Sequence, residues 1–139
     1  MPSSRVTRSF AGSFLIAAAA FALVTSLLAA AQAPDAAAHK QWMNDASDAQ
    51  EDFRFAVTDK DQKAAVEALA KLEGLMSRTE DYWTAKKSND GVKLAKEARA
   101  LAAQGGTAAK AGNFTAATGA FDKMGASCNS CHELHLEKK

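Results

Sequence analysis

The two cysteines of the chain stand three positions apart, and a histidine follows the second one directly, so that Cys128, Cys131 and His132 form a C-x-x-C-H motif. This motif is the attachment signature of c-type haem. On a helix, positions i, i+3 and i+4 lie on one face. Both thiols can therefore reach the two vinyl groups of one porphyrin and form thioethers, while the imidazole meets the iron from the same side. The motif predicts one covalently bound haem c, with His132 as the proximal iron ligand.

Other chemistries use the same residue types. A redox dithiol of the thioredoxin kind belongs near a βαβ pattern, whereas this motif lies late in an alanine-rich chain with no strand predicted before it. A simple disulfide between Cys128 and Cys131 is the second alternative. A zinc site is weaker, because the motif supplies three ligands and no second cluster completes them. Haem attachment is the interpretation that the motif favours.

The elements that carry the motif are predicted to be helices. Alanine accounts for 33 of the 139 residues, and beyond position 31 there are three valines and no isoleucine. A sheet core needs β-branched and aromatic residues, whereas Ala, Lys, Glu, Gln and Leu favour helix. The formal net charge of +1 gives no reason to expect nucleic acid as a partner. Composition therefore indicates an all-α domain.

Apolar periodicity and turn signals predict four helices after residue 32. Their expected ranges are about 35–57, 60–87, 91–111 and 114–137. The connections between them are short, and short connections are typical of an antiparallel up-down four-helix bundle. The C-x-x-C-H motif then places the haem near the C-terminus of the last helix.

Specific residues mark the predicted breaks. Thr58-Asp59 offers a break and a new N-cap, residues 88–91 (SNDG) form a turn cluster, and Gly112-Asn113 gives a stop followed by a cap. Gly105-Gly106 weakens the third helix, which is expected to end early or kink there.

Only 20 large apolar residues occur from position 32 onward, which is few for a self-sufficient core of this size. A bulky apolar group is expected to complete it.

The N-terminus has the pattern of a secretory signal peptide. Residues 1–9 contain Arg5 and Arg8 and no acid, and residues 10–31 are uncharged and end in small side chains. Cleavage after Ala31 would leave residues 32–139 as a periplasmic domain with no membrane anchor. A cut after Ala33 fits the small-residue rule equally, but Pro34 would follow it. An uncleaved anchor is the remaining alternative, because 22 apolar positions can span a bilayer.

A four-helix chain that ends in C-x-x-C-H resembles the class II cytochromes c, the cytochrome c prime family. Phe121, Gly125 and the haem motif look like that family's F-x-x-x-G-x-x-C-x-x-C-H run. The sequence departs from the family pattern in two places. His135 and Leu136 stand where the family often has an aromatic and then a basic residue, and His39 stands where it tends to carry an arginine. The resemblance implies a homodimer.

The resemblance also implies which position would supply a distal ligand to the iron in those members that have one. Met43 lies on the apolar stripe of the first predicted helix and corresponds to the family position at which ligating members carry Met. His/Met ligation raises the reduction potential towards values useful to an electron carrier. The expected function is a periplasmic carrier of single electrons between redox partner proteins, through a six-coordinate haem. Two alternatives stay open. In the first, His39 is the distal ligand in place of Met43; in the second, Met43 is an ordinary core residue.

A second function class stays open. A five-coordinate, high-spin haem would bind nitric oxide or carbon monoxide on its open side, and the resemblance implies that the family includes such members. An enzyme is not expected. Peroxidase-type chemistry would need a distal histidine with an arginine, and the arginine of the first predicted helix, Arg54, lies about three turns beyond Met43.

Overall fold

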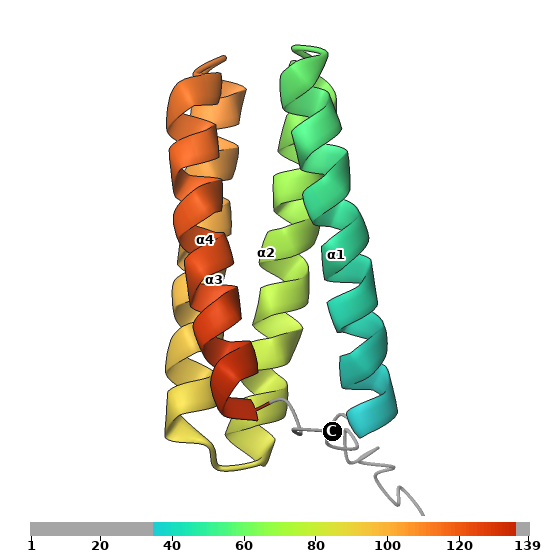
Figure 1. Ribbon diagram of the computed structural model, residues 1–139, viewed down its shortest axis with the longest axis vertical. Helices are drawn as coiled ribbons and strands as arrows, with labels where there is room; N and C mark the ends of the chain where they lie inside the picture. Colours follow the sequence, from blue (N-terminus) through green and yellow to red (C-terminus); the bar gives the residue numbers. More distant parts are fainter. Residues whose placement is uncertain (1–34, 136–139) are drawn as a thin grey trace, which may run out of the picture. The chain divides into compact units, whose positions relative to one another are not determined.

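The computed structural model describes residues 35–135, and helices occupy almost all of them. The four helices are α1 (Ala36–Thr58), α2 (Gln62–Ala85), α3 (Asn89–Lys110) and α4 (Phe114–His135). They lie side by side along one long axis, joined by short turns at alternate ends (Figure 1). The predicted all-α four-helix bundle is confirmed. The predicted signal peptide, residues 1–31, lies outside the described residues, as do residues 136 and 137 of the fourth predicted helix.

Each helix begins at a polar side chain that accepts a hydrogen bond from the first turn. The accepting side chains are those of Asp35, Asp61, Ser88 and Asn113. A cap of this kind stabilises a helix by about 1 kcal/mol. The predicted cap at Asn113 is confirmed, and Gly112 precedes it in the left-handed region with φ 73°.

The first two turns lie at slightly different residues from those predicted. Asp59 does not cap α2: its N–H donates to the carbonyl of Phe55 at 2.9 Å and so closes α1. Lys60 then takes a positive φ of 56°, and Asp61 becomes the cap. In the second connection the left-handed residue is Lys87, with φ 57°, so Asn89 already begins α3.

The third helix lies within two residues of its predicted range, about 91–111, and the early end considered at Gly105-Gly106 does not occur. Helix α3 continues through both glycines to Lys110. Gly105 is buried, and a Cβ there would lie 3.3 Å from Cδ2 of Leu69 on α2. The glycine therefore admits a core leucine, and that packing offsets the intrinsic helix cost of glycine, which is about 1 kcal/mol.

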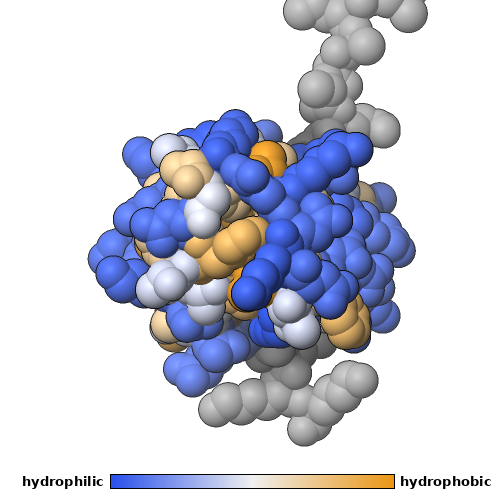
Figure 2. All heavy atoms as spheres, turned by 90° about the horizontal axis from the view of Figure 1, so that it is seen from above, coloured by the Kyte–Doolittle hydropathy of each residue, from blue (hydrophilic) through white to orange (hydrophobic). Residues whose placement is uncertain are grey.

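The core combines a few large side chains with many alanines. Phe53, Leu69, Leu72 and Met124 are the largest fully buried side chains. The pairs α1–α2, α2–α3 and α3–α4 pack closely, whereas α1 and α4 make few backbone approaches, so that α2 is visible between them in Figure 1. Seen from above, the end with the α1–α2 turn is hydrophilic at its rim, and apolar residues gather towards its centre (Figure 2). Among the neighbouring helices of the bundle, α1 and α4 are therefore the pair whose backbones approach each other least.

Gly91→Ala should destabilise the bundle. A Cβ on Gly91 would lie 2.6 Å from Cγ of Trp83, so the indole ring would have to move. We expect the free energy of unfolding to fall by about 1–3 kcal/mol, as for other overpacked sites. Gly74→Ala is the matched control, because nothing lies within 4 Å of its Cβ. There the free energy of unfolding should rise by up to about 1 kcal/mol. Urea denaturation measures both, and a Gly91→Ala protein as stable as wild type would contradict the contact.

Candidate functional site

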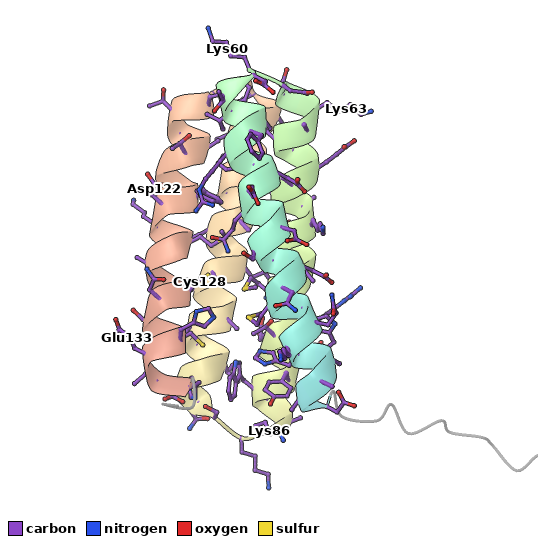
Figure 3. The ribbon with its side chains drawn as sticks, turned by 45° about the vertical axis from the view of Figure 1, so that its right-hand side comes forward. Lys60, Lys63, Lys86, Asp122, Cys128 and Glu133 are labelled. Atoms are coloured by element: carbon purple, nitrogen blue, oxygen red, sulfur yellow. The ribbon has the colours of Figure 1, made fainter. Side chains whose placement is uncertain are left out.

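The C-x-x-C-H motif occupies the last turns of α4 on the side that meets the seam with α1. Cys128 is half-buried and packs against the core, Cys131 is half-buried, and His132 is exposed. Figure 3 shows Asp122 and Glu133 pointing away from the bundle on the outer side of α4, whereas Cys128 lies on its inner side. The helical spacing therefore directs both thiols and the imidazole to one side, as the sequence predicts.

Two adjoining cavities lie where α1 meets α4. The smaller has a volume of about 50 Å³ and the larger about 350 Å³. They share four lining residues, which are Met43, Thr79, Cys131 and His132. The structure thus brings Met43, the predicted distal ligand on α1, to the same cavities as the motif on α4. A cavity of a few hundred Å³ with a small number of polar groups is typical of a cofactor site.

The smaller cavity is apolar. Besides the shared residues, its lining includes Ala46, Met76, Leu94 and Cys128. The buried hydroxyls beside it are already engaged: Thr79 Oγ1 donates to the carbonyl of Leu75 at 2.9 Å. Ser127 Oγ likewise donates to the carbonyl of Leu94 at 3.2 Å. Both hydroxyl protons are therefore used within the chain, and Gln50 and His132 are the remaining side chains with N–H groups in the described lining.

The larger cavity is lined by aromatic rings from three helices. The imidazole of His39 on α1 stacks on Tyr82 of α2, with ring centroids 4.1 Å apart and planes within 1°. Trp83 meets His39 edge-on at 5.5 Å and packs on His135 of α4 at 4.2 Å. Sequence reasoning singled out neither Tyr82 nor Trp83 for the site. Their only signal in the sequence is two adjacent aromatics near the end of the second helix, which does not reveal contacts with α1 and α4.

Burial keeps both thiols protonated. It raises the pKa of Cys128 to about 11, with a smaller contribution from the charge of Cys131. Burial also raises the pKa of Cys131, and the charge of Asp90 adds to this. A redox dithiol needs the opposite, a pKa lowered so that the thiolate forms near neutral pH. The raised pKa values therefore give the dithiol interpretation no support, and the two cysteines are not joined by a disulfide in this structure.

The surroundings of His39 favour the neutral form of its imidazole. Burial lowers its pKa, and the charge of His132 lowers it further. The two histidines therefore approach each other across the larger cavity, which both of them line. Arg54 lies elsewhere: its guanidinium carbon stands 5.1 Å from the centre of the Phe121 ring, and it lines neither of the two cavities.

No protein-family model, curated protein or solved structure matches the chain. Within residues 35–135, no group of three or more His, Cys, Asp or Glu side chains is placed to hold a metal ion by itself. None of the four described helices has the length and apolar character needed to cross a membrane.

In folded protein produced without haem maturation, Cys128 should react slowly with iodoacetamide. A pKa of about 11 lowers its thiolate fraction about 100-fold at pH 8 relative to a thiol with the ordinary pKa of 9.0, and only the thiolate attacks. Mass spectrometry of partly alkylated protein should find Cys131, which is less buried, modified before Cys128. Urea unfolds the protein, so both thiols should then react at the rate of solvent-exposed thiols. Equal and rapid labelling of both cysteines in the folded protein would contradict the buried positions.

Proposed function

We propose that this protein is a periplasmic c-type cytochrome that carries single electrons between redox partner proteins. Cys128 and Cys131 would hold one haem through thioethers, His132 would be its proximal ligand, and Met43 would be its distal ligand. The observation that carries the proposal is that residues from two helices far apart in sequence, α1 and α4, line the same two cavities. The confirmed four-helix bundle is compatible with the resemblance to the class II cytochromes c.

The donor set fits the proposed group. The imidazole of His132 and the thioether of Met43 are borderline and soft ligands of the kind that hold haem iron, and the two thiols would form the thioether bonds to the porphyrin vinyl groups. The apolar wall around Cys128 suits a porphyrin ring, and the larger cavity extends the site towards the end of the bundle. When bound, the haem supplies a one-electron couple between ferrous and ferric iron. The chain's own contribution would be to hold His132 on α4 and Met43 on α1, and to keep water from the apolar side.

Two features favour Met43 over His39 as the distal ligand. Met43 lines both cavities together with His132, whereas His39 lines only the larger one. The imidazole of His39 is also committed to a stacked contact with Tyr82 at 4.1 Å, which fixes its plane. Met43 is unbranched and packs only partly against the core, so its thioether is free to turn.

The covalent attachment is tested by removing the thiols. In a host with c-type maturation machinery, the wild-type protein should keep its haem through acid–acetone extraction and denaturing electrophoresis. Cys128→Ala combined with Cys131→Ala should abolish that retention, since no thioether can then form. Ser127→Ala together with Ser130→Ala is a matched control on the same turns and should retain the haem. Free extraction of haem from the wild-type protein would overturn the proposal.

The axial ligand decides between the carrier and the gas-binding alternative. The wild-type ferric protein should give a low-spin spectrum with the far-red band of an iron–methionine bond. Met43→Ala should lose that band, become high-spin and bind carbon monoxide, because the sixth position is then open. Met76→Ala, which also removes a methionine that lines the smaller cavity, should keep the band. A wild-type protein that is already high-spin and binds carbon monoxide freely would favour a gas-binding protein instead.

A further inference from the structure

Three buried nitrogen atoms around the larger cavity have no hydrogen-bond partner among residues 35–135. They are His39 Nε2, Trp83 Nε1 and His135 Nε2, and all three residues line this cavity. Among residues 35–135, one further buried side-chain atom, Glu80 Oε2, lacks a hydrogen bond, and it lies 3.2 Å from Arg99 in an ion pair. Buried polar groups are normally paired, so a group of three around one cavity requires an explanation.

The three nitrogens differ in the kind of hydrogen-bond partner that each can take. The indole Nε1–H of Trp83 is a donor only, so its partner must be an acceptor. His135 Nε2 already lies 3.5 Å from a carboxylate oxygen of Asp90, which pairs with it when the imidazole is protonated. The two nitrogens left for a ligand are therefore those of Trp83 and His39.

Packing prevents the indole from turning to find another partner. One side of Trp83 lies against Gly91, where even a Cβ would come within 2.6 Å of the ring. His135 packs on it at a centroid distance of 4.2 Å, and Tyr82 meets it edge-on at 5.0 Å. The stacking of His39 on Tyr82 fixes that imidazole in the same way. Both nitrogens therefore belong to rings held in position beside the cavity.

The charge of the cavity favours an anionic acceptor. Lys40 lines it beside His39, and no aspartate or glutamate is among the described residues that line it; the carboxylate of Asp90 lies behind His135 and is paired with it at 3.5 Å. The neighbouring cavity at Cys128 is apolar, so the combined site runs from an apolar end to an end with donors and a cation. A haem has the same asymmetry, because its vinyl groups lie on one edge and its two propionate carboxylates on the other.

We propose that Trp83 Nε1–H and His39 Nε2–H donate hydrogen bonds to a propionate carboxylate of the haem, with Lys40 as the nearby cation. This inference rests on the proposed function. Tyr82, Gly91 and His135 act as positioning residues, since they hold the two donor rings. Hydrogen bonds to a charged acceptor are shorter and about twice as strong as neutral ones, so the pair would fix the orientation of the porphyrin edge.

Trp83→Phe removes the N–H and keeps an aromatic ring against Gly91. Trp42→Phe is the matched control, because Trp42 is also half-buried but lines neither cavity. His39→Phe removes the second donor and keeps a ring to stack on Tyr82. When one of the two donors is removed, the negative charge of the propionate is less compensated by hydrogen bonds. This favours ferric iron. We expect the equilibrium constant for reduction to fall about three- to tenfold in both variants and to stay unchanged in Trp42→Phe, where tenfold corresponds to 59 mV for one electron.

Two further measurements on the same holoproteins separate the possible failures. The propionate bending band in the resonance Raman spectrum should shift in Trp83→Phe and His39→Phe, while the low-spin spectrum persists. An unchanged band and potential in both variants, with haem covalently retained, would overturn the propionate site and leave the proposed function standing. Haem that extracts freely from the wild-type protein would overturn the proposed function itself. Loss of the low-spin spectrum in His39→Phe would make His39 an iron ligand and overturn its propionate role.

Discussion

The spacing between α1 and α4 is the constraint on which the site depends. Near one end of this seam the two helices are joined through Phe53 and Phe121, whose ring centroids are 4.6 Å apart. Towards the other end, the stacked rings of His39 and Tyr82 connect α1 to α2 instead. Between these two aromatic contacts the α1 side chain at position 46 is an alanine. The Phe53–Phe121 pair thus acts as the spacer between α1 and α4, while the small side chain of Ala46 leaves room beside Cys128 and Met43.

Local features of the fold could be predicted from the sequence. Helix composition, the stop at Gly112 and the cap at Asn113 depend on residues within a few positions of one another. The common direction of the C-x-x-C-H side chains is local as well, because it follows from helical periodicity alone. For this reason the sequence predicted both the bundle and the face of α4 that meets the cavities.

Features that depend on contacts between helices could not be predicted in this way. Gly105 looked like a break because glycine weakens a helix, but Leu69 from α2 occupies the space that its missing side chain leaves. The place of Trp83 beside the larger cavity could not be predicted for the same reason, since its neighbours His39 and His135 come from the two ends of the described chain. A propensity describes one residue in its own helix, whereas these two roles are set by residues more than thirty positions away.

The unpartnered donors also connect the site to the stability of the fold. Each buried polar group without a partner costs about 1–3 kcal/mol, which is a large fraction of the stability of a small domain. The alanine-rich core has few large side chains to offset that cost. An acceptor that binds the folded bundle and not the unfolded chain removes the cost and stabilises the fold by mass action. The donors of Trp83 and His39 would therefore couple occupation of the larger cavity to folding of the end of the bundle. The proposed thioethers at Cys128 and Cys131 would make that coupling permanent, because a covalently held group cannot dissociate from the folded chain.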